Sequence, residues 1–274
     1  TSYELRATRY EFIMEILVPI LILGSLGLLF GMGLAIASKR LAVHVDERLE
    51  KIHGLLPGAN CGACGGAGCF GFAEGLLSGK LNVDACRVAE EAIKGKISYL
   101  LGQKIEKKVK KTAVLHCYGG IKVKDKFIYK GISNCVAANL VLGGQKGCSY
   151  GCLGFGTCEK VCPFGAIKMS SEGLPIIDQN KCKACDKCVL ICPKKLFALI
   201  SITHNVYVAC SSCDSAKVTR AVCPVGCIAC KLCEKACKFS AIHVINNLAV
   251  IDYHKCTSCG ECVKVCPVKC IRTR

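Results

Sequence analysis

The sequence predicts an α+β protein with one membrane helix near its amino-terminal end and small cysteine-rich domains after it. Three observations support this fold class. Residues 16–37 form an uncharged and mostly apolar run, 26 of the 274 residues are cysteine, and most cysteines recur in short repeated motifs separated by strand-like segments. So many cysteines in one chain require a specific use, because ordinary soluble domains contain few of them.

The apolar run Ile16 to Ala37 is long enough, as a helix, to cross a hydrocarbon core of about 30 Å. A signal peptide is the alternative, but its apolar region usually has only about 7 to 15 residues. More basic residues follow the run than precede it, namely Lys39, Arg40, Arg48 and Lys51 against Arg6 and Arg9. We therefore expect a single-pass protein of the cytoplasmic membrane, with its cysteine-rich part on the cytoplasmic side.

The spacing of the cysteines distinguishes three possible uses. Disulfide scaffolds do not place cysteines in repeated three-residue steps. Zinc sites use two well-separated Cys-x2-Cys pairs, whereas several runs here carry three or four closely spaced cysteines. Such runs are typical of iron-sulfur ligands, so we expect 4Fe-4S clusters, with a zinc-bound structural scaffold as the rival of a different class.

The first predicted cluster site lies in a glycine-rich segment soon after the membrane helix. Its cysteines have the spacing Cys-x2-Cys-x4-Cys-x16-Cys and are Cys61, Cys64, Cys69 and Cys86. Glycines allow the sharp turns and positive φ angles of a loop that wraps a cluster. We expect short helices at residues 72–77 and 88–97 beside this site.

Two further runs form a bacterial ferredoxin pair. Residues 182–193 follow the pattern Cys-x2-Cys-x2-Cys-x3-Cys-Pro, and residues 148–163 form a loosened version of it. In this pattern the fourth cysteine of each run binds the cluster of the other run. The predicted ligand sets are Cys148, Cys152, Cys158 and Cys192 for one cluster, and Cys182, Cys185, Cys188 and Cys162 for the other.

The same unit repeats in the last part of the chain, where Lys238 replaces one of the expected prolines. The predicted ligand sets are Cys227, Cys230, Cys233 and Cys266, and Cys256, Cys259, Cys262 and Cys237. Between the paired runs we expect two-stranded hairpins, formed by residues 167–169 with 175–177 and by residues 242–245 with 249–251.

Five clusters account for 20 cysteines. Six cysteines remain, and they are Cys117, Cys135, Cys210, Cys213, Cys223 and Cys270. We interpret these six as buried or free thiols, because four ligands at a suitable spacing cannot be named among them, and a sixth cluster is the alternative. The expected domains are residues 1–40, 41–100, 101–145, 146–205 and 206–274, the third being a linker and a small insert with strands at 113–116 and 127–129.

The net charge of +17 suggests an acidic partner. A large share of this positive charge compensates the negative charge of the predicted clusters and their thiolate ligands. The chain has no Trp and no interleaved aromatic and basic residues, so we expect no nucleic acid as partner. The lysine-rich run 104–111 is interpreted as solvated surface, with a docking patch as the alternative.

With these features the chain resembles the B subunit of the Rnf complex, a membrane-bound ferredoxin:NAD oxidoreductase. The most specific segments are residues 60–69, 151–158 and 225–230, and the likeness covers nearly the whole chain. It implies a small four-iron domain and two tandem ferredoxin-like domains that take electrons from reduced ferredoxin and pass them to other Rnf subunits. In that complex the transfer drives Na⁺ or H⁺ translocation coupled to NAD⁺ reduction.

The chain itself supports only the relay, because it lacks a Gly-x-Gly-x-x-Gly nucleotide fingerprint and has one membrane span. We therefore expect a subunit of an oxidoreductase with no substrate-converting site of its own. An iron-sulfur subunit of a membrane hydrogenase or formate dehydrogenase is the alternative within electron transfer.

Overall fold

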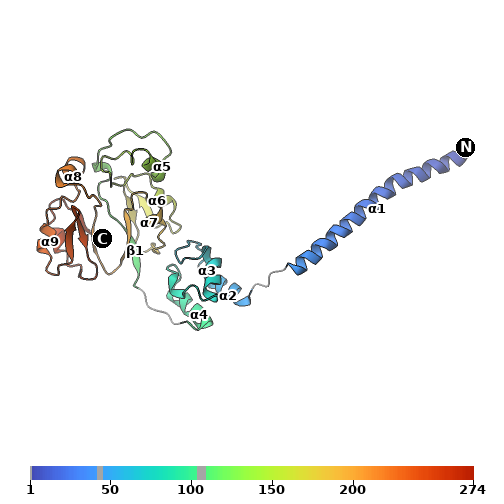
Figure 1. Ribbon diagram of the computed structural model, residues 1–274, viewed down its shortest axis with the longest axis horizontal. Coiled ribbons are helices and arrows are strands. Elements are labelled where there is room, and N and C mark those ends of the chain that lie inside the picture. The colour runs from blue at the N-terminus through green and yellow to red at the C-terminus, as the bar shows by residue number, and fades with distance from the viewer. Residues whose placement is uncertain (1, 42–45, 104–108) are drawn as a thin grey trace. The chain divides into compact units, whose positions relative to one another are not determined.

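The computed structural model describes residues 2–41, 46–103 and 109–274, and the side chains of residues 2–13, 15 and 16 are outside this description (Figure 1). The side chains of Arg6 and Arg9 and most of the lysine-rich run 104–111 therefore lie outside this description. The chain divides into two compact units, residues 1–50 and 51–274. We describe each unit separately.

The first unit consists mainly of one long helix, α1 (Ser2–Arg40), which ends with Lys39 and Arg40 in its last turn. Its segment Leu17–Arg40 is long and apolar enough to cross a membrane, and none of it is buried inside the protein. Pro19 lies within the helix without interrupting it. The helix predicted from the apolar run is confirmed.

Helices surround the first cysteine-rich segment. They are α2 (Glu47–Leu55), α3 (Gly68–Leu77), the 3₁₀ turn η1 (Val83–Ala85) and α4 (Glu91–Leu101). Both helices expected here form, although α3 begins earlier than predicted because the side chain of Asn60 accepts a hydrogen bond from the Cys69 N–H at 2.8 Å and fixes the first turn. Phe72, Leu76 and Ile97 are almost fully buried.

Residues 109–274 contain four two-stranded antiparallel sheets arranged as two copies of one plan. The outer pairs are β1 (Lys111–Leu115) with β4 (Phe197–Ser201), and β5 (Val206–Val208) with β8 (Ile271–Thr273). The inner hairpins are β2 (Ile167–Met169) with β3 (Pro175–Ile177), and β6 (Ile242–Ile245) with β7 (Leu248–Ile251). Both predicted hairpins are confirmed.

Each copy also has two very short helices that each contain the third cysteine of a ferredoxin run. They are α6 (Thr157–Lys160) and α7 (Lys187–Ile191) in the first copy, and α9 (Leu232–Ala236) and α10 (Glu261–Lys264) in the second. Glu159 accepts a hydrogen bond from the Met169 N–H, and Glu234 accepts one from the Val244 N–H, both at 3.3 Å. Equivalent carboxylates thus attach helix to hairpin in both copies.

The expected small insert does not form a separate sheet. Its first strand is β1, which pairs with β4 more than 80 positions later and so belongs to the first ferredoxin-like copy. The strand predicted at residues 127–129 is wrong, because this segment is irregular and only Asp125 and Lys146 form a bridge nearby. The remaining elements are η2 (Gly120–Lys122), α5 (Cys135–Leu140) and α8 (Ala216–Val222).

The cores of the two copies are built partly from cysteines. Leu196, Phe197 and Ile167 pack with several cysteines in the first copy, and Val206 and Ile271 do so in the second. Strands of three to five residues bury little apolar surface by themselves. Cysteine side chains therefore occupy core positions that large apolar residues would fill in a larger domain.

Candidate metal centres

The first set of cysteines, called site I, consists of Cys61, Cys64, Cys69 and Cys86. Gly62, Gly65 and Gly68 all have positive φ angles, which give the loop its tight turns. Burial raises the pKa of the Cys86 thiol, the N–H groups of Ala89 and Val88 oppose this rise, and the charges of Cys64 and Cys61 add to it. Cys86 therefore lies within electrostatic reach of Cys61 and Cys64.

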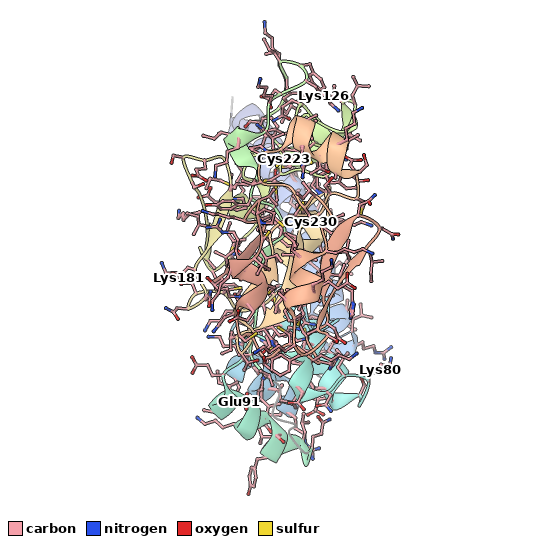
Figure 2. The ribbon with its side chains drawn as sticks, turned by 90° about the vertical axis from the view of Figure 1, so that its left-hand side faces the viewer. Lys80, Glu91, Lys126, Lys181, Cys223 and Cys230 are labelled. Carbon is pink, nitrogen blue, oxygen red and sulfur yellow. The ribbon has the colours of Figure 1, made fainter. Side chains whose placement is uncertain are left out.

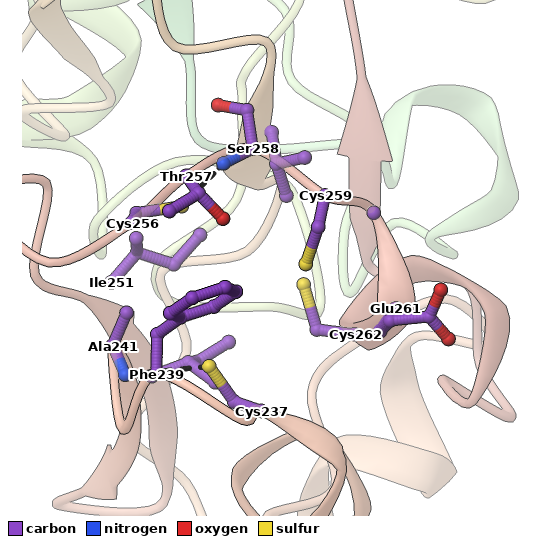
Figure 3. Close-up of a pocket in the computed structure, with 13 residues that line it drawn as sticks. Cys237, Phe239, Ala241, Ile251, Cys256, Thr257, Ser258, Cys259, Glu261 and Cys262 are labelled. Carbon is purple, nitrogen blue, oxygen red and sulfur yellow. Dashed lines mark hydrogen bonds between the residues drawn. The ribbon is translucent and has the colours of Figure 1, made fainter.

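Three of the four ferredoxin-type sets predicted from sequence each line one hollow. We call them site II (Cys162, Cys182, Cys185 and Cys188), site V (Cys227, Cys230, Cys233 and Cys266) and site VI (Cys237, Cys256, Cys259 and Cys262). Figure 3 shows site VI, where the sulfurs of Cys259 and Cys262 point into the hollow beside the ring of Phe239, while Glu261 points away.

The structure does not bring the fourth predicted set together in this way. Cys148 lines a different hollow with three cysteines that were expected to be free, and we call this set site IV (Cys117, Cys148, Cys210 and Cys223). The hollows at sites II, IV, V and VI comprise about 350, 340, 290 and 350 Å³ of space between atoms, respectively, part of which is open to solvent. Site IV therefore resembles the three other hollows in size and in its set of four cysteines.

The two copies contribute to site IV in equivalent ways. Cys117 follows β1 by two residues, and Cys210 follows β5 by two residues. The sulfur of Cys117 accepts a hydrogen bond from the Cys152 N–H at 3.4 Å, and that of Cys210 accepts one from the Cys227 N–H at 3.3 Å. Each copy thus places one cysteine from its first strand against the backbone of its own ferredoxin motif.

The other two cysteines of site IV are equivalent as well. Cys148 precedes Cys152 by four residues, and Cys223 precedes Cys227 by four, each within Cys-x2-Gly-Cys. In the second copy tight packing requires the glycine, because a Cβ at Gly226 would lie 2.4 Å from Thr219 Cγ2, whereas a Cβ at Gly151 would lie 3.3 Å from the Cβ of Cys148. This shared pentapeptide is the sequence signal that could have revealed site IV.

Cys135 lies close to two cysteines of the first ferredoxin motif, Cys152 and Cys158. Burial raises the pKa of Cys158 to about 11, and the charge of Cys135 is the next largest cause, followed by effects that include the charge of Cys192. The Cys135 N–H donates to the Thr157 hydroxyl at 2.8 Å, which fixes the start of α5 beside α6. We call this set site III (Cys135, Cys152, Cys158 and Cys192).

Burial dominates the titration of many of these thiols. It raises the pKa of Cys152 and Cys188 to about 12, and that of Cys210, Cys233 and Cys262 to about 11. A thiol must lose its proton to bind iron, so iron binding at these positions releases protons.

Two cysteines remain outside the six sets. Cys213 is exposed, whereas Cys270 is 2% exposed and its sulfur lies 3.6 Å from that of Cys266. A hydrogen bond from the Cys270 thiol lowers the pKa of Cys266 to about 5 and that of Cys227 to about 6. Cys270 thus stabilises the thiolate form of two predicted ligands at site V.

The arrangement favours a cluster over a single ion. No group of three or more His, Cys, Asp or Glu side chains within the described residues is placed to hold one metal ion. A zinc ion would need sulfur atoms at about 2.3 Å from one centre. Rings of four cysteines around a hollow instead suit a 4Fe-4S core bound through four thiolates.

Comparison with known families and proteins agrees with this chemistry. Residues 56–88 match the FeS family model for an Fe-S cluster, residues 148–197 match the 4Fe-4S dicluster domain, and residues 249–272 match the 4Fe-4S binding domain. The three matches place Fe-S motifs in the segment of site I, in the two runs of the first ferredoxin-like copy and in the last run of the second copy.

Curated relatives match over nearly the whole chain. The B subunit of the Na⁺-translocating ferredoxin:NAD⁺ oxidoreductase complex of Acetobacterium woodii is 45% identical over 93% of this chain and 77% of its own length. The B subunit of the ion-translocating oxidoreductase complex of Methanosarcina acetivorans is 40% identical over 93% of this chain and 97% of its own. The chain belongs to this family of B subunits. The corresponding protein of the proton-translocating complex of Clostridium ljungdahlii, another member, is 40% identical over 94% of this chain and 92% of its own length.

Proposed function

We propose that this B subunit is the electron relay of an ion-translocating ferredoxin:NAD oxidoreductase. It receives electrons from reduced ferredoxin and delivers them to membrane redox subunits that couple the transfer to Na⁺ or H⁺ translocation. One observation carries the proposal, which is the uninterrupted succession of four-cysteine sites through residues 51–274. The names of the relatives supply the donor and the coupled process. Bound clusters supply one-electron redox chemistry.

We propose six 4Fe-4S clusters rather than five, held by sites I to VI. Compared with the sets expected from sequence, Cys148 moves from site III to site IV, and Cys135 takes its place. Four of the six cysteines expected to be free thus become ligands. The similar volumes of the hollows and the equivalent hydrogen bonds to Cys117 and Cys210 support this grouping.

The order of the relay follows from the neighbours of each site. The Cys227 N–H bonds to Cys210 and links sites V and IV, and the Cys152 N–H bonds to Cys117 and links sites IV and III. Sites III and II share one core, as do sites V and VI. Electrons entering at site VI or V would therefore pass through IV, III and II to reach site I.

Entry at the carboxyl-terminal copy is supported by exposure and charge. Cys230 and Cys259 are exposed, whereas most other predicted ligands are buried or partly buried. Lys231 and Lys238 are exposed and directly follow Cys230 of site V and Cys237 of site VI. Lysines such as Lys181 also project from the ribbon elsewhere (Figure 2). A positive surface around exposed ligands suits an acidic ferredoxin.

We also propose that the helix Leu17–Arg40 anchors the protein in the cytoplasmic membrane as a single span. The basic residues Lys39 and Arg40 at its carboxyl end favour the cytoplasmic side for residues 51–274. Oxygen-sensitive clusters suit that reducing compartment.

Iron and acid-labile sulfide analysis of the anaerobically purified chain tests this function. Six clusters correspond to about 24 irons, and paramagnetic resonance after reduction should display interacting 4Fe-4S signals. Cys223→Ala should lose about four irons, whereas the matched variant Cys213→Ala should lose none. About 20 irons in the unmodified chain, with no loss in Cys223→Ala, would restore the five-cluster grouping, and zinc in place of iron would exclude electron transfer.

A further inference from the structure

Arg87 joins two of the proposed cluster sites. It follows Cys86 of site I directly in sequence, and its Nη1 donates hydrogen bonds to Asp186 Oδ2 at 2.5 Å and to the carbonyl oxygen of Ala184 at 3.4 Å. Ala184 and Asp186 stand on either side of Cys185 of site II. One guanidinium thus connects the residue next to a site I ligand with both neighbours of a site II ligand.

The site II loop is shaped to present these two acceptors. Ala184 and Asp186 both have positive φ angles, +53° and +64°, which turn the chain sharply around Cys185. Ala184 is buried, so its carbonyl oxygen has little access to water. A planar guanidinium with several donors can serve a carbonyl and a carboxylate at once.

The two sites are neighbours at this pair. Arg87 follows Cys86 of site I directly, and its two acceptors flank Cys185 of site II, so the hydrogen bonds bring a ligand segment of one site against a ligand segment of the other.

We propose that Arg87 is a positioning residue that holds site I next to site II through its hydrogen bonds to Asp186 and Ala184, a link that we call the clasp. The clasp fixes the distance over which electrons leave the ferredoxin-like copies. This inference rests on the proposed function, because it assumes clusters at both sites. The rate of electron transfer falls steeply with distance, so a loosened clasp slows this one step while every cluster remains bound.

The expected effect is moderate. The Arg87 and Asp186 side chains are 43% and 29% exposed, and ion pairs of this kind shift an equilibrium only several-fold. Their attraction is also screened by salt. The clasp therefore favours the arrangement in which sites I and II lie next to each other. In its absence we expect a mixture of molecules with the two sites together and molecules with the two sites apart.

The test uses the full chain with its clusters and the variants Arg87→Ala, Arg87→Lys and Asp186→Asn. Asparagine keeps the shape of Asp186 and tolerates its positive φ. Lys168→Ala is the matched control, because it removes an exposed ion pair of 3.5 Å with Glu159, which lies beside Cys158 of site III. The resonance signal of site I is identified by its loss in Cys64→Ala.

Three measurements are made on each variant: iron content, the magnetic interaction between reduced sites I and II, and the rate at which reduced ferredoxin reduces site I. We expect full iron in all variants, and a weaker interaction with a several-fold slower rate in Arg87→Ala and Asp186→Asn. The double variant Arg87→Ala with Asp186→Asn should be no slower than either single variant. Arg87→Lys should recover part of the rate, and the control should match the unmodified chain.

The clasp is refuted if Arg87→Ala and Asp186→Asn keep full iron together with the original interaction and rate. Independent, additive losses in the double variant would equally contradict it. Failure of the proposed function is distinguishable, because the unmodified chain would then lack iron or show no resonance signal from site I.

Discussion

Four residues after the last cysteine of each ferredoxin run, a buried side chain lies beside a predicted ligand. It is Ala166, Leu196 and Ala241 in three runs and Cys270 in the fourth. The backbone N–H groups of Leu196 and Ala241 donate to the sulfurs of Cys192 and Cys237 at 3.5 and 3.3 Å. Only in the last run does a side chain add an S–H donor.

Cys270→Ala should lower the reduction potential of the cluster at site V. Hydrogen bonds to ligand sulfurs stabilise the more negative, reduced cluster and raise its potential. We expect a change of several-fold in the reduction equilibrium, where tenfold corresponds to about 59 mV for one electron. Potentiometric titration followed by paramagnetic resonance measures it.

Ala241→Cys is the converse variant, because Ala241 occupies the position of Cys270 at the fourth cysteine of site VI. It should raise the potential of site VI. An unchanged site V potential in Cys270→Ala, with iron content intact, would show that this thiol serves packing alone.

The strands and helices of the ferredoxin-like copies are too short to be stable alone. Apart from α5 and α8, no described element between residues 116 and 274 exceeds five residues, and the cores contain cysteines at central positions. Bonds from these cysteines to a cluster would replace the apolar burial that the elements lack.

Anaerobic removal of iron with a chelator should therefore unfold residues 109–274. Buried thiols with pKa values near 11 to 12 become protonated and neutral once iron leaves, so no charge is trapped, but the links between hairpins and loops are lost. Amide hydrogen exchange should lose its protection in β2, β3, β6 and β7 and keep it in α1 in detergent. Retained protection of the hairpins would mean that apolar packing suffices.

Local patterns predict these elements well, whereas distant pairings escape prediction. The hairpin of Ile167 and Ile177 lies within one short segment, and so alternation and turn residues reveal it. The sequence alone assigns β1 to an insert, because its partner β4 is far along the chain. The closeness of Cys135 to Cys152 and Cys158 escapes prediction for the same physical reason, since the three come together only through the fold.

At the scale of the whole molecule, site IV occupies the junction between the two ferredoxin-like copies. Each copy supplies two of its cysteines, and the residues around it join the copies. His116 Nδ1 lies 2.7 Å from the carbonyl oxygen of Val208, and the Ser211 hydroxyl donates to the carbonyl oxygen of His116 at 2.9 Å. A cluster here would connect two pairs of sites that otherwise lie in separate cores.

Cys117→Ala with Cys223→Ala should therefore divide the relay without damaging its ends. Reduced ferredoxin should still reduce sites V and VI at the original rate, but sites I to III at least tenfold more slowly, because electrons would have to cross the unfilled junction. Freeze-quench paramagnetic resonance follows both groups of signals in one experiment. Dithionite, a small reductant that can reach each exposed site directly, should still reduce all five remaining clusters.

Cys213→Ala is the control, since it removes an exposed cysteine of the second copy that belongs to no site. It should leave both rates unchanged. If sites I to III are reduced at the original rate in the double variant, ferredoxin delivers electrons to the first copy directly and the linear order is wrong. If sites V and VI are reduced more slowly while sites I to III keep their original rate, ferredoxin enters at the first copy and the direction of the relay is reversed.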